Sequence, residues 1–418
     1  MVLCHSCEGG KRVRYIQRAL ETRVAESLKT HPVVVLTGPR QVGKSTLLEH
    51  APFLRGWRYL TLDDRDVLDQ AREDPKGLLW EDKPTILDEV QRHAPIFLTV
   101  KYFVDRSQGK RKFILSGSGN ISLRKEPRES LAGRARYLYL TPLSVSELFP
   151  RQSRGVLETF FLKGRLENAR SRVEADALKA TWRGGLPKVT LTRSIKAALE
   201  TLAGYVDTYI ERDIQDLIKI RHPENFRRLM AALAKATGWT TVQEELSKVS
   251  GEERSNVSRH VSLLQETGLL YEVKGYCRRG ERAYRQAKYF WFDSGVACFL
   301  AGIHSPRQLR QRGLKGRYFE NLIFQQMLFF ASLQVVPPEI FYWRPKGEEW
   351  EVDFVLQHKG EIVPVEVKSS EELTYRDSRS LRQFLKVHPE AKRGLLVYAG
   401  SKTYPIATGI YAVPWTAL

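Results

Sequence analysis

The sequence predicts an α/β fold with a glycine-rich loop in its N-terminal third, and three features carry this prediction. Residues 33–36 form a run of Val and Leu, which is typical of a strand buried in a parallel sheet. The sequence GPRQVGKS follows at residues 38–45, and an apolar helix opening comes directly after it. Two further predicted strands, 85–87 and 112–115, end in polar residues. This order of strand, glycine-rich loop, helix and polar-ended strands indicates a nucleotide-binding core.

The glycine-rich loop predicts how the nucleotide is held. Its glycines allow backbone N–H groups to turn inward around phosphate oxygens, while the Lys44 ammonium reaches the terminal phosphates and the Ser45 hydroxyl binds Mg²⁺. We therefore expect ATP and Mg²⁺ as the ligands of this loop. The predicted nucleotide-binding residues are Gly38, Pro39, Arg40, Gln41, Val42, Gly43, Lys44, Ser45 and Thr46.

The polar ends of the next two strands supply the expected catalytic groups. Asp88 is predicted to hold Mg²⁺, usually through water, and Glu89 to polarise the attacking water. Ser118 follows the third strand and is a candidate sensor of the γ-phosphate, because strand C-termini face the nucleotide in such sheets. An ordinary loop of Gly and Ser is the alternative interpretation of this last segment.

Five motifs together resemble a prokaryotic AAA-type ATPase family, over about residues 13–150. They are GPRQVGKS at 38–45, LDEVQ at 87–91, LSGS at 115–118, SLAGR at 130–134 and LTPLSVSEL at 140–148. The resemblance implies a three-layer P-loop core that often assembles as a ring, so a homo-oligomer is expected. It also makes Arg134 a candidate arginine acting on a neighbouring subunit's γ-phosphate. Arg136 competes for that role, and a solvated helix charge is the alternative.

Composition indicates an anionic partner. The chain holds 67 Lys and Arg against 48 Asp and Glu, a formal net charge of +19. Nucleic acid is the first candidate and an anionic membrane surface the second, although a basic source proteome would have the same composition. No apolar run reaches the roughly 20 residues of a membrane span, so we expect no membrane partner and a cytoplasmic location. Cys4 and Cys7 have CxxC spacing without a second pair, which leaves a zinc site or a ragged tail open.

Residues 223–300 carry the pattern of a winged helix. A first helix with an apolar face ends at Gly238, a second spans 241–248, and a third follows the predicted cap at 255–256. Two strands, 269–274 and 283–292, complete the order. The third helix would be the one that enters a DNA groove, with Arg254 and Arg259 pointing outward.

The segment between Tyr271 and Phe290 is strongly basic, with Glu272 and Glu281 as its acidic residues. Its six cations, interleaved with aromatic residues, suit phosphates and stacked bases, but many winged helices contact only proteins. These cations are Lys274, Arg278, Arg279, Arg282, Arg285 and Lys288. The predicted DNA-binding residues are Arg254, Arg259, Lys274, Arg278, Arg279 and Arg282.

The C-terminal region predicts a β-hairpin about a tight turn at Lys359 and Gly360. In that register Asp353 lies directly opposite Glu366, and like charges in this position destabilise a hairpin. A divalent cation between the carboxylates would remove the repulsion, and Lys368 is the competing counter-charge. One face would hold Trp350, Val352, Phe354, Leu356, Val363, Val365 and Val367, and the other Glu351, Asp353, Val355, Gln357, Glu366 and Lys368.

The pattern Asp-x12-Glu-x-Lys with an upstream helical Glu resembles the restriction-endonuclease-like nuclease superfamily. The resemblance implies a nuclease-like site of Glu320, Asp353, Glu366 and Lys368. The chain from about Trp182 onward also resembles an uncharacterised domain family that is often fused to this ATPase type. The alternative is a nuclease fold that keeps its hairpin without cutting, with Lys368 sequestered by Glu351.

The predicted fold class is therefore a three-layer P-loop core, then a helical winged-helix module, then an α/β restriction-endonuclease-like domain. The predicted boundaries are a tail at 1–12, the ATPase at 13–150, a helical connector at 151–222, the winged helix at 223–300 and the nuclease-like domain at 301–418. The favoured function is a Mg²⁺-dependent ATPase acting on DNA. The alternative is a regulatory ATP switch whose winged helix and inactive nuclease-like domain bind proteins.

Overall fold

The computed structural model describes residues 15–117, 131–149, 155–163, 166, 169–171, 173, 175–211, 222–277 and 286–418. The chain divides into two compact units. The first comprises residues 1–143 with 266–268, and the second comprises residues 144–265 with 269–418. Each unit combines helices with a β-sheet, so the predicted α/β class is confirmed.

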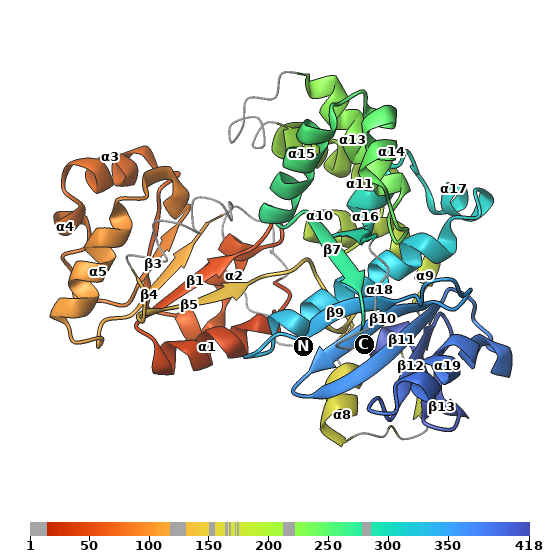
Figure 1. Ribbon diagram of the computed structural model, residues 1–418. Helices are drawn as coiled ribbons and strands as arrows, with labels where there is room; N and C mark the ends of the chain where they lie inside the picture. Colours follow the sequence, from red (N-terminus) through yellow and green to blue (C-terminus); the bar gives the residue numbers. More distant parts are fainter. Residues whose placement is uncertain are drawn as a thin grey trace. The chain divides into compact units, whose positions relative to one another are not determined.

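The first unit contains the predicted strands and the loop between them (Figure 1). Its helices are α1 (Leu20–Thr30), α2 (Lys44–His50), η1 (Pro52–Leu54), α3 (Arg65–Glu73), α4 (Pro75–Leu78), η2 (Val90–His93) and α5 (Ile96–Arg106). Its strands are β1 (Val33–Thr37), β2 (Arg58–Thr61), β3 (Thr85–Asp88), β4 (Phe113–Ser116) and β5 (Ala135–Tyr139).

The sheet of the first unit is entirely parallel, in the order β2-β3-β4-β1-β5. Strands β1, β3 and β4 are buried at every position, as their Val- and Ile-rich sequences require in a sheet covered on both faces. Helices α3, α4 and α5 contribute to one apolar cluster against the sheet. Because all five strands run the same way, the carboxyl ends of β1 and β3 lie at one edge, and this edge carries the predicted site.

The second unit holds the remaining elements around a mixed sheet. Its helices are α7 (Val145–Leu148), α8 (Val156–Lys163), α9 (Ala177–Arg183), α10 (Pro187–Leu191), α11 (Ile195–Tyr205), η3 (Val206–Glu211), α13 (Pro223–Lys235), α14 (Gln243–Ser250), α15 (Arg254–Glu266), α16 (Ser294–Leu300), α17 (Pro306–Gln311), α18 (Lys315–Ser332), η4 (Tyr375–Ser378), α19 (Arg379–Val387) and η5 (Trp415–Ala417). Its strands are β6 (Ala169–Arg170), β7 (Leu270–Gly275), β8 (Lys288–Trp291), β9 (Glu339–Trp343), β10 (Val352–His358), β11 (Glu361–Lys368), β12 (Gly394–Tyr398), β13 (Lys402–Ala407) and β14 (Ile410–Pro414).

Strands from three regions of the chain join in this second sheet, whose order is β6-β13-β14-β12-β11-β10-β9-β7-β8. The predicted order of three helices and two strands is present in α13, α14, α15, β7 and β8 (Figure 1). Strand β8 begins at Lys288, later than the predicted strand, and α15 begins at Arg254, before its predicted cap. Strand β7 also pairs in parallel with β9, so these strands are continuous with the C-terminal sheet.

The predicted hairpin turn and register are confirmed. Strands β10 and β11 are antiparallel, with Phe354 opposite Val365. Lys359 and Gly360 have φ angles of 51° and 82°, the left-handed pair that a two-residue turn needs to match the strand twist. The register places Asp353 near Glu366, as predicted, although the described ladder ends at Phe354.

The predicted apolar face of the hairpin is confirmed in part, because Phe354, Leu356, Val363, Val365 and Val367 lie in or against one apolar cluster. Its members Trp350 and Val352 were placed wrongly, and the opposite face is not polar. Phe354 packs in the apolar cluster that includes α18, whereas Val352 and Val355 both pack in the cluster that includes α19. Trp350 also lies against the α19 cluster. The register of β10 against β9 shifts between Val352 and Val355, and such a bulge interrupts the alternation of side chains. Both faces are therefore covered by apolar side chains.

Asp293 connects the glycine-rich break at residues 184–185 to the start of α16. Its buried carboxylate accepts hydrogen bonds from the backbone N–H groups of Gly185, at 2.7 Å, and Val296, at 3.0 Å. Burial raises the pKa of Asp293 to about 6, and these backbone donors oppose the rise. The carboxylate therefore holds two buried segments together.

We predict that Asp293→Ala lowers the free energy of unfolding of the second unit by about 2–4 kcal/mol, because two buried N–H donors lose their acceptor. Urea unfolding followed by tryptophan fluorescence would measure the loss. Asp176→Ala is the matched control, since Asp176 caps α9 in the same way from an exposed position and should cost about 1 kcal/mol. Equal losses in the two variants would contradict the bridging role of Asp293.

Candidate functional site

The glycine-rich loop follows β1 and is shaped by backbone conformations that side chains rarely allow. Gly38 has a φ angle of 143°, and a Cβ atom there would lie 2.3 Å from the backbone oxygen of Leu140. Gly43 has a φ angle of 99° and directly precedes α2. The loop therefore turns tightly between strand and helix, as the sequence pattern predicts.

Lys44 is the charged group at the centre of this loop. Its side chain is buried, and the ammonium donates to the backbone oxygens of Gly38, at 2.9 Å, and Pro39, at 2.8 Å. Burial lowers the pKa of Lys44 to about 8, and the nearby carboxylates of Glu89 and Asp88 oppose this change. The ammonium thus lies across the loop, near both residues predicted to follow β3.

Asp88 is the last residue of β3, and Tyr59 of the neighbouring strand holds its carboxylate. The Tyr59 hydroxyl donates to Asp88 Oδ2 at 2.7 Å, and the backbone N–H of Glu89 donates to Oδ1 at 3.0 Å. The Ser45 hydroxyl contributes a hydrogen bond to the Tyr59 oxygen. Burial and Asp88 raise the pKa of Tyr59, so the phenol stays protonated as a donor. Tyr59 therefore connects the two residues that the sequence predicts as Mg²⁺ ligands.

Sequence reasoning missed Tyr59. It lies in β2, where it pairs with Ile86 of β3, and only the parallel pairing of these strands brings its hydroxyl to Asp88. The sequence gives only a weak indication of this role, because Tyr59 is a single tyrosine two residues before the end of an edge strand. Such a residue is more often part of the apolar packing of a sheet.

Glu89 has the left-handed backbone, with a φ angle of 54°. This conformation costs a residue other than glycine about 1–3 kcal/mol, and such strain is often found at functional sites. Its carboxylate accepts a hydrogen bond from the Gln91 side chain. The strained turn places Glu89 directly after Asp88 and before η2, on the same edge of the sheet as the loop.

Two other predicted residues stand apart from this group. Arg134 forms an ion pair with Asp105 through two nitrogens, at 2.5 Å and 3.0 Å, and donates to the backbone oxygen of Ala132. In the single chain its guanidinium is therefore already engaged. Ser118, the predicted sensor, lies outside the described residues.

Helix α15, which the sequence predicts to enter a DNA groove, has a polar face. Arg254 and Arg259 are exposed, whereas the apolar residues predicted to face inward are buried. Arg254 forms an ion pair with Glu244 at 3.0 Å, and Lys274 is exposed and lies 3.8 Å from Glu272. Three serines are exposed beside the arginines: Ser255, Ser258 and Ser262. The remaining predicted DNA-binding residues, Arg278, Arg279 and Arg282, lie outside the described residues.

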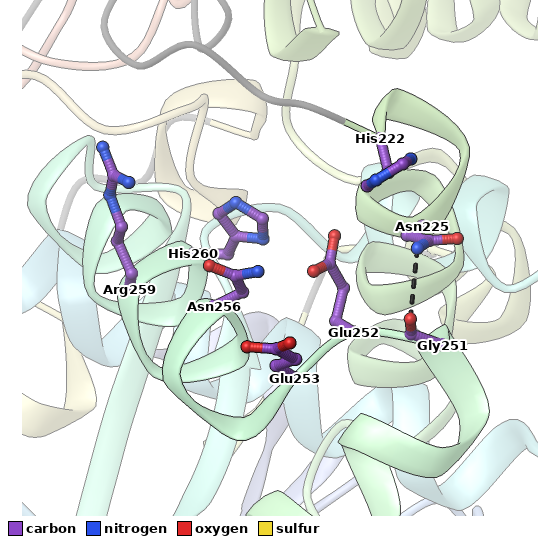
Figure 2. A pocket seen from close by; sticks show the side chains of 8 residues that line it. All are labelled: His222, Asn225, Gly251, Glu252, Glu253, Asn256, Arg259 and His260. Carbon is purple, nitrogen blue, oxygen red and sulfur yellow. Dashed lines mark hydrogen bonds between the residues drawn. The ribbon is translucent and has the colours of Figure 1, made fainter.

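A cavity of about 510 Å³ lies beside α15 (Figure 2). Arg259 and the buried His260 line it from α15, and Asn225 lines it from α13, where its amide donates to the backbone oxygen of Gly251. Burial lowers the pKa of His260. Two carboxylates at the turn before α15, Glu252 and Glu253, also face this space. They make the cavity unsuited to a phosphate, so the exposed outer face of α15 is the better candidate for an anionic partner.

The four predicted nuclease-like residues come together in the second unit. The Asp353 carboxylate accepts from the backbone N–H of Val367 at 2.8 Å. Lys368 pairs with Glu366 at 2.7 Å. Glu320 of α18 lies close enough to Asp353 and Glu366 for the like charges to repel one another. This repulsion adds to the effect of burial in raising the pKa of Glu320 and of Glu366. The alternative pairing of Lys368 with Glu351, raised from the sequence, is not the one present.

Lys288 is the unexpected member of this cluster. The sequence pattern places Lys288 among the basic residues of the wing, but its side chain is only 2% exposed. Its ammonium lies 3.4 Å from Glu320 Oε1 and 2.5 Å from Glu351 Oε1. Lys288 is therefore unavailable to a phosphate, and that part of the basic-wing interpretation is wrong.

Family models match three parts of the chain. Residues 30–149, which hold the glycine-rich loop, match a family model described as an AAA domain. Residues 174–307 and 315–418 match two models described as domains of unknown function, DUF8612 and DUF4143. No helix among the described residues is long and apolar enough to cross a membrane.

Relatives extend beyond the ATPase domain. The chain is 28% identical over 407 residues to the uncharacterized protein Rv2008c of Mycobacterium tuberculosis, a match that covers 95% of this chain and 83% of the relative. It is 22% identical over 377 residues to the uncharacterized protein MJ1544 of Methanocaldococcus jannaschii, which covers 85% and 78%. The solved Walker-type ATPase PABY2304 of Pyrococcus abyssi is 17% identical, with a TM-score of 0.45, over 68% of this chain and 96% of that chain.

We predict that Tyr59→Phe raises the concentration of free Mg²⁺ needed for half-maximal ATP hydrolysis by about tenfold. A hydrogen bond to a charged group contributes about 1.5–3 kcal/mol, and without it the Asp88 carboxylate is no longer held in place. Titration of Mg²⁺ at saturating ATP measures the change. Tyr102→Phe is the control, because that exposed tyrosine bonds only to Arg106 among the hydrogen bonds found. An unchanged Mg²⁺ dependence would show that Tyr59 does not position Asp88.

Proposed function

We propose that this protein is a Mg²⁺-dependent ATPase that acts on DNA. The observation that carries the ATPase part is the meeting of Lys44, Ser45, Asp88 and Glu89 at one edge of the parallel sheet, within the domain matched as AAA-type. Ser45 and Asp88 are linked through Tyr59, and Lys44 interacts electrostatically with Asp88 and Glu89. Strand, loop and helix together form a cradle with the composition that ATP phosphates require.

The groups near Asp88 suit Mg²⁺. A hydroxyl oxygen from Ser45 and a carboxylate from Asp88 are the hard oxygen ligands that this ion prefers, and Tyr59 holds both. Bound there, Mg²⁺ would neutralise charge on the β- and γ-phosphates. Ser45 and Asp88 are the residues proposed to hold it, and ATP is the proposed second ligand.

Lys44 has only neutral partners in the loop, namely two backbone oxygens. Phosphate oxygens are stronger acceptors for an ammonium than carbonyls, so we expect Lys44 to exchange these bonds for contacts with the nucleotide. Glu89 would then orient and polarise the attacking water from the adjacent position. Ser118 keeps its proposed role as sensor of the γ-phosphate.

The proposed role of Arg134 requires an oligomer. To reach a neighbouring subunit's γ-phosphate, its guanidinium would have to leave Asp105, and that exposed pair is weak enough to open, at about 0–1 kcal/mol. In a homo-oligomer, Arg134 would pair with Asp105 when no neighbouring γ-phosphate is within reach. It would leave Asp105 for the γ-phosphate when one is. Arg136 remains the alternative arginine.

Support for DNA as the partner comes from charge and from the order of elements in residues 223–291. The outward arginines of α15 lie among serines, a face suited to phosphates and base edges. The proposed contact residues are Arg254, Arg259, Lys274, Arg278, Arg279 and Arg282. With a formal net charge of +19, the chain favours a polyanion over a neutral protein surface.

A second candidate function is a regulatory ATP switch whose C-terminal sheet binds other proteins. The pairing of Lys288 with the carboxylates of the nuclease-like cluster favours it, because an internally neutralised cluster has less use as a cutting centre. Stimulation of ATP hydrolysis by DNA would separate the two functions. A several-fold increase supports the DNA-acting enzyme, and no response to single-stranded, duplex or branched DNA supports the switch.

We predict that Lys44→Ala abolishes ATP hydrolysis, because the γ-phosphate loses its main cation. Glu89→Gln should retain ATP binding while turnover falls by about 100-fold or more, the usual contribution of a positioned base. Fluorescent-nucleotide binding and phosphate release measure the two properties. Lys83→Ala removes an exposed lysine of the same unit and should leave both unchanged. Wild-type turnover in Glu89→Gln would assign the water-polarising role elsewhere.

We predict that duplex DNA binds with steep salt dependence. Each lost phosphate contact should reduce the slope of log affinity against log salt by roughly 0.7–0.9, so replacing Arg278, Arg279 and Arg282 with Ala lowers affinity and flattens the slope together. The control replaces three exposed arginines of the first unit, Arg65, Arg72 and Arg106, which changes net charge equally. Equal effects of the two triple variants would mean that net charge alone attracts DNA.

A further inference from the structure

The nuclease superfamily that the C-terminal motif resembles implies a divalent metal at the carboxylates, and the residues present do not fit one. Within the part of the chain that the structure describes, no three His, Cys, Asp or Glu side chains are arranged to hold a metal ion. One oxygen of each of two carboxylates is already engaged by a protein group. Asp353 accepts from the Val367 backbone, and Glu366 accepts from Lys368.

A buried lysine supplies the cation instead. Lys288 enters the cluster from β8, and its ammonium contacts Glu320 of α18 and Glu351, which directly precedes β10. The same ammonium lies 5.3 Å from the centre of the Tyr342 ring in β9. Three other segments therefore contribute groups around the Lys288 ammonium, and this is the arrangement that a buried ammonium needs to offset its desolvation.

Lys288 and Lys368 both lie against carboxylates of the cluster. The Lys288 ammonium lies 3.4 Å from Glu320 and 2.5 Å from Glu351, and the Lys368 ammonium lies 2.7 Å from Glu366. Burial lowers the pKa of Lys288, but the carboxylates of Glu320, Asp353 and Glu351 outweigh it, so the pKa lies above the ordinary value. Two ammonium groups of the protein therefore already lie among these carboxylates.

Glu366 is the carboxylate at which a metal would have to compete with an ammonium group of the protein. Its side chain is only 7% exposed, and its Oε2 atom is buried without a hydrogen-bond partner. An ionised carboxylate with an unpartnered buried oxygen is costly, so a proton or a cation must compensate it. Lys288 and Lys368 already lie beside the cluster, so a divalent cation would have to compete with two ammonium groups for these carboxylates.

We propose that Lys288 is a built-in cation that takes the place of a divalent metal in the cluster of Glu320, Asp353 and Glu366. The cluster is a structural junction between α18, the hairpin and β8, and it does not cut DNA. Removing the lysine charge uncovers the carboxylates as oxygen ligands for a hard divalent cation.

The test is Mn²⁺ binding to the full chain without nucleotide, measured by calorimetry in wild type and in Lys288→Met. Methionine keeps the length of the side chain and removes its charge. We expect the variant to gain one Mn²⁺ site that wild type lacks, and to lose it again when Asp353→Asn is added. Lys274→Met, which removes an exposed lysine from the adjoining strand β7, should gain no site.

A second variant covers the case in which Lys288→Met does not fold. The double variant Lys288→Met with Glu351→Gln removes both members of the shortest ion pair, which is less costly than leaving one charge unpaired. It keeps Glu320, Asp353 and Glu366 and should also gain the site. A folded variant without Mn²⁺ binding would overturn the proposal.

Wild type itself provides a test that needs no destabilised variant. Mn²⁺ binding should be the same in wild type and Asp353→Asn, because neither protein offers the carboxylates to a metal. Binding in wild type that Asp353→Asn abolishes would overturn the proposal, and so would Mn²⁺-dependent cleavage of plasmid DNA that the same change stops. These outcomes leave the ATPase proposal untouched, since they involve the second unit alone.

Discussion

Burial of an ammonium group is the constraint on which both candidate sites depend. A lysine charge removed from water costs several kcal/mol unless other groups replace its hydration. Lys44 and Lys288 are both buried, but their partners differ. Lys44 is held by two neutral carbonyls, and its pKa falls to about 8. Lys288 is held by carboxylates, and its pKa rises above the ordinary value.

This difference separates a site that can receive a ligand from one that is complete. The hydrogen bonds of Lys44 go to neutral carbonyls, so an incoming phosphate would offer its ammonium stronger acceptors. Lys288 pairs directly with carboxylates, and a ligand would have to displace them. The Lys44 site therefore suits a phosphate ligand, whereas the Lys288 cluster joins strands and helices from separate parts of the chain.

Two features of the candidate nucleotide site, at the edge of the parallel sheet where β1 and β3 end, depend on how the strands are arranged. Tyr59 reaches Asp88 because β2 lies beside β3, and the strained turn at Glu89 follows β3 directly.

The DNA-binding part of the proposal depends on α15, whose arginines and serines are exposed while its apolar side is buried. In the proposed function, the residues for ATP turnover and those for DNA contact belong to different units of the chain.

Local sequence determined the features that depend on local physics. The loop from Gly38 to Ser45, the order of helices and strands in residues 223–291, and the turn at Lys359 and Gly360 follow from backbone preferences and side-chain periodicity. Tertiary structure alone decided three others: the bulge between Val352 and Val355, the bond from Tyr59 to Asp88, and the burial of Lys288 among carboxylates. Each of these depends on which distant strands become neighbours. A run of residues specifies its own periodicity, but it does not specify the partner that a charged side chain meets across a sheet.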